Sequence, residues 1–492
     1  MSYSDTINYI YNLQKHGTKF GLSNITRLVS ILGNPHESFP SVHVAGTNGK
    51  GSTSAFIASL LKVSGLKVGL FTSPHLVSFT ERIRVNSEEI TEYEVMSLTE
   101  EIRSKVVDFS PTFFEVVTAL AFLYFQRKRI DIAVIEVGMG GRLDATNILM
   151  PEVSVITCID YDHREYLGDT LSEIAYEKAG IIKDSIPVVI SSQAPDVLEV
   201  IEAKAKEKNS EVYLYGRDFS AVLKREDPSG ICFDYFGGDS FDIHDLYLPL
   251  IGEHQMQNAT VAIKAATILL NKIGKKRRNG EREIERKIET GISPILRFSD
   301  SPGHEKEIIS LIRKGLASTR WPGRLEMIQD NPPILIDGAH NPAAAVVLSR
   351  ALVKNFLGIY KRIILILGIM GDKDIEGIMK PLLPIASEII LTSPGYERAA
   401  PPAKLAGIAA SLGFPEARVA PCVKDAIEMA IKIAECGMQN SECEMRSTEY
   451  EIIPKSEICK PKSLIVITGS FYTIGEAEEV LGQKGVLTRL RE

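Results

Sequence analysis

A turn of small residues between an apolar strand and a helix is the part of the sequence best suited to chemistry. The segment SVHVAGTNGKGST, residues 41–53, predicts a strand over 41–44 and a helix from about Ser54 to Val63. Glycines in such a turn let backbone N–H groups approach oxyanions, and the helix N-terminus adds positive potential. Lys50 can reach a terminal phosphate, and the hydroxyl of Ser52 or Thr53 can ligate Mg2+. The spacing is tighter than the standard G-x-x-x-x-G-K-[ST] motif, and the alternative is a tight strand–helix connection, but the segment predicts a phosphate site.

Polar residues follow three predicted strands of the same series. Ser73 and His163 each come shortly after a strand, and Glu136 lies at the end of the continuous apolar strand 131–137. Open α/β sheets bind their ligands at the carboxyl ends of the strands. A carboxylate placed there, opposite a phosphate turn, is a suitable Mg2+ ligand. The alternatives are a structural acid bonded to turn amides for Glu136 and an ordinary structural histidine for His163.

Other charged residues in this region favour a structural interpretation. Arg82 and Arg84 alternate with apolar residues, which predicts a solvated strand edge. Lys178 lies on a predicted helix with Glu173 and Glu177, where a surface Glu–Lys pairing is the ordinary arrangement.

The elements that must position these residues form two α/β series. The first, residues 1–320, opens with two helices and includes a polar insert at about 271–310. The motif Trp321-Pro322-Gly323-Arg324 predicts a linker to the second series, residues 321–492, which has a polar segment at 436–462. This alternation predicts an N-terminal P-loop ATPase-type doubly wound domain followed by a smaller Rossmann-like C-terminal domain. The second series has no G-x-G-x-x-G turn after its first strand, which argues against a nicotinamide domain.

Composition limits the possible partners. The chain has 492 residues, 44% of them apolar, so it can bury large cores without disulfide or metal staples. Its net charge of −7 argues against a general binder of nucleic acid or anionic membranes. The N-terminus does not resemble a signal peptide, and no apolar stretch is long enough to span a bilayer. None of the six cysteines forms a C-x-x-C pair, so we expect neither a zinc site nor a disulfide framework, and the expected compartment is the cytoplasm.

Seven motifs, taken together, resemble one enzyme family. They are GTNGKGS at 46–52, TSPHL at 72–76, EVGMGGRLDATN at 136–147, DH at 162–163, EKAGI at 177–181, PGRLE at 322–326 and DGAHNP at 337–342. In this order they resemble the folylpolyglutamate synthase/dihydrofolate synthase family, a branch of the Mur ligase superfamily. The resemblance implies ligation of L-glutamate to a pterin or folate carboxylate, with ATP and Mg2+, through an acyl-phosphate. It also implies a monomer.

The same resemblance implies roles for individual residues. ATP would be bound by Gly49, Lys50, Gly51, Ser52, Asn258, Arg324 and Asp337. Mg2+ would be held by Ser73, Glu136, His163 and, as a carbamate, Lys178. The pterin side would use the 72–76 loop together with Thr112, Phe113, Phe114, Glu115, Leu143, Asp144 and Ala145. Lys50, Lys178 and His340 would act in catalysis, His340 through electrostatics or positioning. Because Arg324 and Asp337 belong to the second domain, domain closure is expected to assemble the site.

Two other functions compete with this one. Cell-wall Mur ligases carry a nucleotide-sugar domain before the phosphate loop, whereas only residues 1–40 precede it here. A regulatory P-loop ATPase would have no use for the DGAHNP turn or a lysine carbamate. Tyr161 and Arg164 depart from the usual family residues, so the acceptor is left open between dihydropteroate, a reduced folate and a modified pterin.

Overall fold

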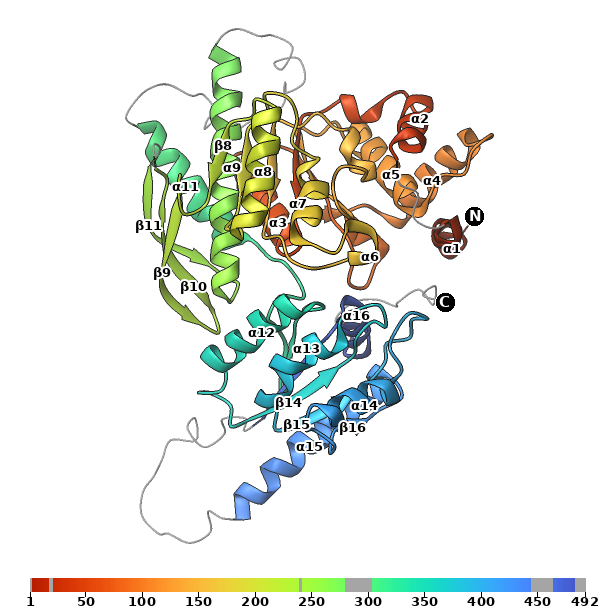
Figure 1. Cartoon of the computed structure of the whole chain (residues 1–492), viewed down its shortest axis with the longest axis vertical. Helices are drawn as coiled ribbons and strands as arrows, with labels where there is room; N and C mark the ends of the chain where they lie inside the picture. Colours follow the sequence, from red (N-terminus) through yellow and green to blue (C-terminus); the bar gives the residue numbers. More distant parts are fainter. Residues whose placement is uncertain (1, 17–20, 239–240, 279–302, 444–462, 483–492) are drawn as a thin grey trace.

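The computed structural model of the chain describes residues 2–16, 21–238, 241–278, 303–443 and 463–482. These residues form two α/β lobes, which lie one above the other in Figure 1. The chain passes from the first lobe to the second after α11 (Gly303–Ser318). This arrangement agrees with the predicted α/β class and its two parallel sheets.

The first lobe is built on an eight-stranded sheet in the order β4-β3-β2-β5-β1-β6-β7-β8. Strands β2, β5, β1, β6, β7 and β8 are parallel, and β3 and β4 add an antiparallel edge. The strands are β1 (Ser41–Ala45), β2 (Val68–Phe71), β3 (Ile83–Val85), β4 (Glu88–Glu89), β5 (Ile132–Glu136), β6 (Val153–Ile156), β7 (Val188–Ile190) and β8 (Val212–Leu214). The central strands are buried along their whole length, as expected for a parallel sheet covered on both faces.

Alternate side chains of this sheet enter different cores. On β5, Ile132 and Val134 pack with residues of α3 and α9, whereas Ala133 and Ile135 pack with residues of α5. This follows from the two-residue period of a strand. The helices of the lobe are α1 (Tyr3–Asn12), α2 (Ser23–Ile31), α3 (Lys50–Val63), α4 (Glu92–Lys105), α5 (Phe113–Lys128), α6 (Arg164–Leu167), α7 (Leu171–Ala179), α8 (Pro195–Glu207), α9 (Glu253–Arg278) and α11.

A separate antiparallel sheet lies at the side of the first lobe, in the order β11-β10-β9. Its strands are β9 (Ser220–Asp227), β10 (Gly230–Phe236) and β11 (Asp242–Leu248). Phe233 and Leu246 from this sheet share a core with apolar residues of α9 and α11. The predicted polar insert at 271–310 overlaps the end of α9 and the start of α11, and residues 279–302 lie outside the described ranges.

The second lobe has a six-stranded sheet in the order β12-β13-β17-β14-β15-β16, parallel except for the edge strand β12. The strands are β12 (Glu326–Asp330), β13 (Pro333–Ile336), β14 (Arg362–Leu367), β15 (Glu388–Leu391), β16 (Arg418–Val419) and β17 (Ser463–Thr468). The helices are α12 (Pro342–Asn355), α13 (Ile375–Leu382), α14 (Pro402–Ser411), α15 (Val423–Cys443) and α16 (Phe471–Val480).

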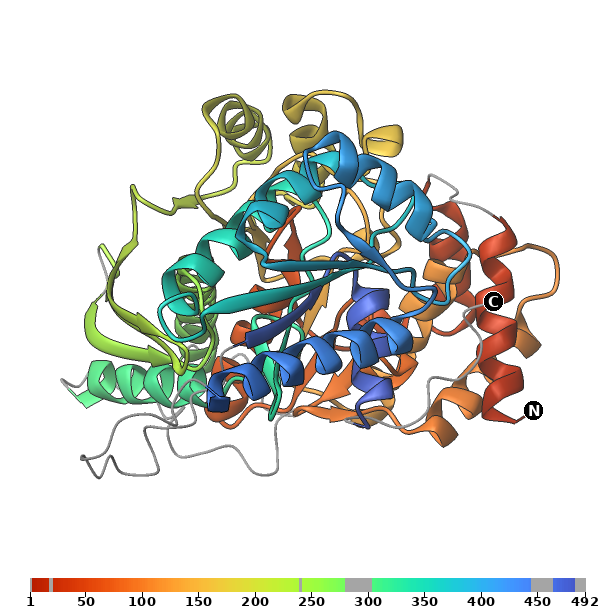
Figure 2. The ribbon, with the colours of Figure 1, turned by 90° about the horizontal axis from the view of Figure 1, so that it is seen from below.

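Helices cover both faces of this second sheet, as Figure 2 shows. On β14, Leu365 packs toward the core of α12, α13 and α14, and Ile366 packs toward α15 and α16. The predicted polar segment at 436–462 begins within α15, and residues 444–462 lie outside the described ranges. Among the described residues, no helix is both long and apolar enough to cross a lipid bilayer.

Candidate active site

The phosphate turn connects β1 to α3 and uses glycine where a side chain cannot fit. Gly49 has a φ of 87°, and a Cβ atom on it would lie 2.4 Å from Oδ1 of Asn258. Helix α3 begins at Lys50, so the prediction that it begins near Ser54 was wrong. The earlier start places Lys50, Gly51 and Ser52 in the first helical turn, where N–H groups have no partner inside the helix. The Lys50 ammonium donates a hydrogen bond to the carbonyl of Thr47 at 3.2 Å.

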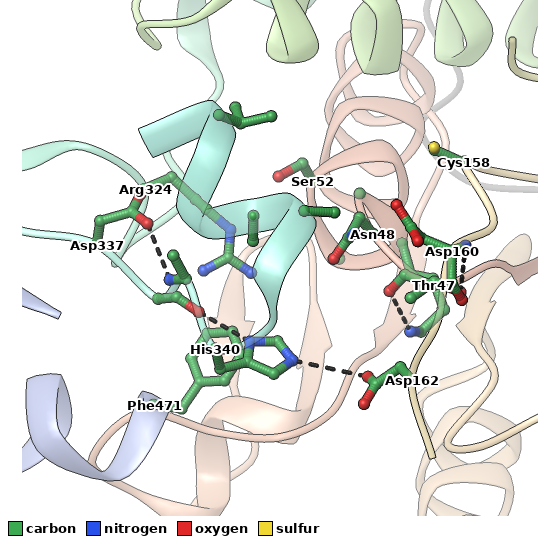
Figure 3. A pocket seen from close by; sticks show the side chains of 18 of the residues that line it. Thr47, Asn48, Ser52, Cys158, Asp160, Asp162, Arg324, Asp337, His340 and Phe471 are labelled. Atoms are coloured by element: carbon green, nitrogen blue, oxygen red, sulfur yellow. Dashed lines mark hydrogen bonds and ion pairs between the residues drawn. The ribbon is translucent and has the colours of Figure 1, made fainter. Parts of the chain in front are cut away.

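A cavity of about 500 Å³ lies over this turn, between the two lobes. Figure 3 shows Arg324, Asp337, His340 and Phe471 of the second lobe on one side and Asn48, Ser52 and Asp160 of the first lobe on the other. Eleven of the predicted site residues line the cavity: Gly49, Lys50, Gly51, Ser52, Ser73, Glu136, His163, Asn258, Arg324, Asp337 and His340. The fold thus brings together residues that are as much as 291 positions apart in the sequence, from Gly49 to His340.

Glu136 ends strand β5 and is buried at the floor of the cavity. Its Oε2 accepts the backbone N–H of Ser73 at 3.1 Å. Burial raises the pKa of Glu136 to about 7, against the opposing effect of the Lys50 charge. A carboxylate in this state gains from a bound cation, which would hold it ionised.

Lys178 is buried beneath the phosphate turn, and its Nζ donates to the carbonyl of Gly46 at 2.8 Å. The expected surface pairing with Glu173 and Glu177 was wrong. Glu177 pairs with Arg142, and Glu173 caps its own helix at Thr170. Burial, reinforced by Lys50, lowers the pKa of Lys178 to about 7, so much of this amine is neutral near neutral pH.

The second lobe supplies a cation, a carboxylate and an imidazole. The Arg324 guanidinium lies 4.8 Å from the ring centre of Phe471. Asp337 accepts the backbone N–H groups of Leu325 and Ala339, at 3.0 and 2.9 Å, and these bonds fix the turn that leads to His340.

His340 donates from Nδ1 to the carbonyl of Gly338 at 2.9 Å, because a carbonyl can only accept. Burial lowers the pKa of His340 to about 4, so its ring is neutral at pH 7. The Nε2 atom therefore carries a free lone pair in the neutral ring, and it faces Asp162 at 4.0 Å.

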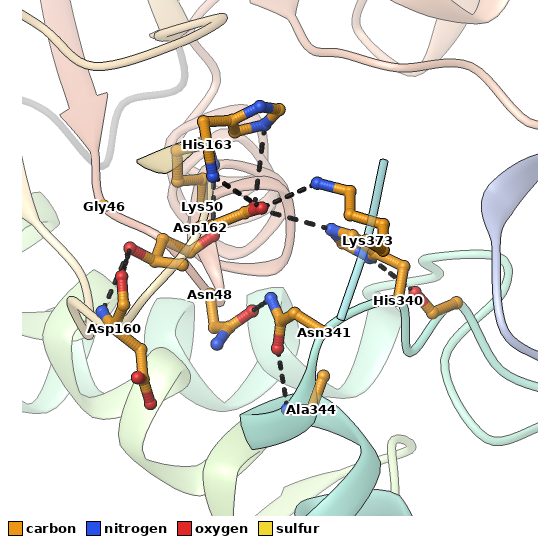
Figure 4. Close-up of polar contacts among 12 residues, drawn as sticks. Gly46, Asn48, Lys50, Asp160, Asp162, His163, His340, Asn341, Ala344 and Lys373 are labelled. Atoms are coloured by element: carbon orange, nitrogen blue, oxygen red, sulfur yellow. Dashed lines mark hydrogen bonds and ion pairs between the residues drawn. The ribbon is translucent and has the colours of Figure 1, made fainter. Parts of the chain in front are cut away.

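A charged cluster joins the lobes beside the cavity, as Figure 4 shows. Asp162 of the first lobe accepts a hydrogen bond from the Lys373 ammonium of the second lobe at 2.6 Å. His163 lies 3.6 Å from the same carboxylate. Asp162 and Lys373 line the cavity and were not among the predicted site residues. Their positions after strands β6 and β14 were the available signal, since polar residues at strand ends were the criterion that selected His163.

Thr112 and Glu115, predicted to contact the substrate, form the cap of α5. The N–H of Thr112 donates to Glu115 at 2.6 Å, and the N–H of Glu115 donates to the Thr112 hydroxyl at 3.3 Å. The two aromatic residues between them have different surroundings. Phe113 stacks on Tyr11 with ring centres 5.4 Å apart, and Phe114 lies against Gly138, which lines the cavity.

Leu143, Asp144 and Ala145 lie outside the lining of the cavity. Asp144 is buried and accepts hydrogen bonds from the N–H and hydroxyl of Thr146 and from the N–H of Met139. Ala145 is buried in the core that contains α5. The contacts of Asp144 organise the turn after β5, and contact of these three residues with a substrate stays a prediction.

Arg82 is not at a solvated strand edge, as the sequence had suggested. Its side chain is buried, and its Nε donates to Nδ1 of His75 at 2.8 Å. Arg84 is also largely covered, pairs with Glu89 at 3.3 Å and lies 5.8 Å from the ring of Trp321. Only Arg84 lies on β3, whereas Arg82 ends a short 3-10 helix, Phe79–Arg82, so the predicted strand alternation does not extend to Arg82.

Within the described residues, no group of three or more His, Cys, Asp or Glu side chains is close enough to hold a metal ion on its own. A cation at this site would therefore need further oxygen ligands, such as the Ser73 hydroxyl, nucleotide phosphates and water. This donor set is typical of Mg2+, which keeps several waters and binds through one or two carboxylates plus phosphates.

Two family models match the chain. The Mur ligase middle domain matches residues 44–266, and the Mur ligase glutamate ligase domain matches residues 323–439. The first match contains the phosphate turn and Glu136, and the second contains Arg324, Asp337 and His340.

Individual proteins are similar over most of the chain. The folylpolyglutamate synthase of Lacticaseibacillus casei is 37% identical over 411 residues, which cover 82% of this chain and 88% of the relative. The dihydrofolate synthase/folylpolyglutamate synthase of Bacillus subtilis is 37% identical over 406 residues, covering 81% of this chain and 86% of the relative. Among solved structures, Mycobacterium tuberculosis folylpolyglutamate synthase complexed with ADP superposes with a TM-score of 0.83 at 30% identity, covering 99% of this chain and 100% of the other.

Proposed function

The chain belongs to the folylpolyglutamate synthase/dihydrofolate synthase family of the Mur ligases, and from this premise we propose that it uses ATP to join L-glutamate to the carboxylate of a pterin or folate. Relatives in this family are named for both activities, the first addition of glutamate and the extension of the glutamate chain. We propose that the chain has one or both.

The observation that carries this proposal is the common cavity. It is lined by the phosphate turn with Lys50, by the buried carboxylate of Glu136, and by Arg324 and His340 of the second lobe. A ligase needs ATP and two substrates in contact, because activation and amide formation must occur without loss of the activated group to water. A cavity between two lobes supports both steps.

The proposed reaction has two steps. An oxygen of the acceptor carboxylate attacks the γ-phosphorus of ATP and releases ADP, which leaves an acyl-phosphate. The neutral amine of glutamate then attacks the carbonyl carbon, phosphate leaves, and the new amide loses a proton. Gly49, Lys50, Gly51 and Ser52 would hold the phosphates and offset their charge. Asn258, Arg324 and Asp337 would complete the nucleotide site.

Ser73, Glu136 and His163 would hold Mg2+, which would supply charge neutralisation at the phosphates when bound. The raised pKa of Glu136 supports a cation beside it. Partial burial lowers the pKa of His163, so its imidazole is available as a neutral donor, although histidine is an unusual ligand for this hard cation.

Lys178 would act as a carbamate. A protonated lysine repels cations, whereas a carbamate is an anion with oxygen donors. The burial of Lys178 and its lowered pKa support this modification, because only a neutral amine adds CO2. His340 would position or stabilise the reacting groups as a neutral ring.

The acceptor would enter along the 72–76 loop and the aromatic residues Phe113 and Phe114, with Leu143, Asp144 and Ala145 further along the same side. We also propose that the protein is a monomer, since one chain supplies every residue of the proposed site. We propose that it works in the cytoplasm. The proposed domain division is 1–320 and 321–492.

The test is glutamate-dependent phosphate release from ATP with Mg2+, using dihydropteroate in one reaction and tetrahydrofolate in another, with products identified by mass. Turnover with dihydropteroate alone identifies a dihydrofolate synthase, turnover with tetrahydrofolate alone a polyglutamate synthase, and turnover with both a bifunctional enzyme. EDTA should abolish every activity. The absence of glutamate-dependent turnover with either acceptor would contradict the proposal, and glutamate-independent hydrolysis would favour a regulatory ATPase.

A further inference from the structure

Arg82 is a buried cation to which the proposed mechanism gives no part. It lies at the end of a short 3-10 helix, Phe79–Arg82, and directly before β3. Its side chain is 7% exposed, and its guanidinium carbon lies 5.5 Å from the ring centre of Phe113. Among the described residues, no carboxylate lies within 4.0 Å of it. Buried guanidinium groups are normally paired with an anion, because an unpaired buried charge is costly.

The orientation of the Arg82 guanidinium is fixed through one of its nitrogens. Arginine can only donate, so Nδ1 of His75 must accept the bond from Nε. In the neutral His75 ring the proton then lies on Nε2, which is 3.3 Å from the Tyr11 hydroxyl. The hydrogen bond to His75 uses only Nε of Arg82, so the two terminal nitrogens remain available to bind an anion. Paired N–H donors of this kind fit a carboxylate.

Arg82 also lies between two parts of the proposed acceptor path. On one side, Phe113 stacks on Tyr11. On the other, the backbone carbonyl of Arg82 accepts the N–H of Thr72 at 3.0 Å, which ties Arg82 to the 72–76 loop, whose Ser73 and Pro74 line the cavity. The guanidinium therefore lies beside Phe113 and against the 72–76 loop, both of which belong to the acceptor side of the proposed site.

We propose that Arg82 binds the α-carboxylate of a glutamate that the acceptor already carries. This inference rests on the proposed function. Dihydropteroate has a single carboxylate, which must reach the γ-phosphate of ATP. A folate has that reacting γ-carboxylate and, a few bonds nearer to its ring system, an α-carboxylate. A cation beside the aromatic rings and the 72–76 loop matches the second group, so Arg82 determines specificity for extension of the glutamate chain.

The test compares R82Q with the wild type on three acceptors: dihydropteroate, tetrahydrofolate and the α-amide of tetrahydrofolate. The wild type should prefer tetrahydrofolate to its α-amide by about 30-fold or more in kcat/KM, the size expected for a charge pair across an interface. R82Q should lose that preference, mainly through a higher KM for tetrahydrofolate. Its kcat/KM for dihydropteroate should stay within about threefold of the wild-type value, a change of less than 1 kcal/mol.

R103Q is the matched control. Arg103 also lies over an aromatic ring, 5.6 Å from the centre of Tyr9, but it has an acid partner in Glu100 and its side chain is 48% exposed. R103Q should keep the wild-type preference for tetrahydrofolate over its α-amide. R82K, which keeps the charge without the paired donors, should recover part of that preference.

Three results would overturn the inference. If R82Q lost kcat/KM equally on dihydropteroate and on tetrahydrofolate, Arg82 would act on the reacting carboxylate or in folding. If R82Q kept the wild-type preference in kcat/KM for tetrahydrofolate over its α-amide, Arg82 would not bind the α-carboxylate. A wild type that uses dihydropteroate alone would leave the α-carboxylate without a binding site. Failure of the wild type on every acceptor would instead contradict the proposed function.

Discussion

Asn341, at the start of α12 in the second lobe, donates a hydrogen bond from Nδ2 to Oδ1 of Asn48 in the phosphate turn, at 2.9 Å (Figure 4). The Oδ1 of Asn341 also accepts the N–H of Ala344 and so caps α12. One amide group therefore starts a helix in one lobe and contacts the phosphate turn of the other. The position of the second lobe is thereby coupled to the turn that is expected to hold ATP.

Substitutions of Asn341 should separate these two roles. N341S keeps a capping hydroxyl but is too short to reach Asn48, whereas N341A removes both bonds. We expect N341A to lose about 1 kcal/mol of unfolding free energy and N341S only a few tenths. Both variants should lose turnover to a similar degree, because both lose the contact between the lobes. Urea unfolding and kcat/KM for ATP measure the two effects, and full activity in N341S would contradict the role of the contact.

Trp321 should report on the phosphate turn through its fluorescence. It is the single tryptophan of the chain, and a Cβ atom on Gly51 would lie 3.0 Å from its ring. Because Trp321 lies in the segment that joins the lobes, binding of Mg-ATP should change its surroundings. We expect a saturable change in emission on titration with ATP, and loss of the signal in W321F. K50M, which should bind ATP weakly, is the control, and an equal change in K50M would argue against a phosphate-dependent signal.

Much of the site was predictable from residues at strand ends, and the errors have identifiable causes. Glu136 was placed correctly because a continuous apolar run ending in an acid specifies a buried strand and its end. Arg82 and Lys178 were misassigned because their burial depends on neighbouring elements: Phe113 and His75 cover Arg82, and the phosphate turn covers Lys178. The Asp162–Lys373 pair was missed because it joins residues 211 positions apart. Local pattern contains no information about which strand ends of two sheets will face each other.

Glu226 forms a further contact between the lobes, away from the cavity. It lies on β9, accepts a hydrogen bond from Nδ2 of Asn355 at 2.8 Å and pairs with Lys354, both on α12. Its side chain is 3% exposed, so E226A leaves a buried donor unsatisfied and should cost about 1–3 kcal/mol. We also expect E226A to increase the radius of gyration measured by small-angle X-ray scattering, because one of the links between the lobes is lost.

The control for Glu226 lies on the same strand. Lys224 pairs with Asp245 and Asp234 inside the three-stranded sheet and does not contact the second lobe through a described ion pair or hydrogen bond. K224A should leave the radius of gyration unchanged. An equal expansion in K224A and E226A would mean that the sheet itself, and not the contact with α12, determines the arrangement of the lobes.

Lys178 should take up CO2 in a manner that depends on pH. Burial lowers the pKa of this amine to about 7, and a lysine adds CO2 only in its neutral form. The neutral fraction rises as the pH rises through 7 and is about tenfold larger at pH 8 than at pH 6. With 13C-bicarbonate, NMR should therefore show a carbamate carbon at pH 8 that largely disappears at pH 6. A lysine with an ordinary pKa of about 10.4 would instead be almost fully protonated at both pH values.

K178M should lack the signal and lose turnover by about 100-fold or more, as expected when a group that stabilises transition-state charge is removed. A signal that persists in K178M, or full turnover of that variant in bicarbonate buffer, would show that the buried amine serves the fold and not the reaction.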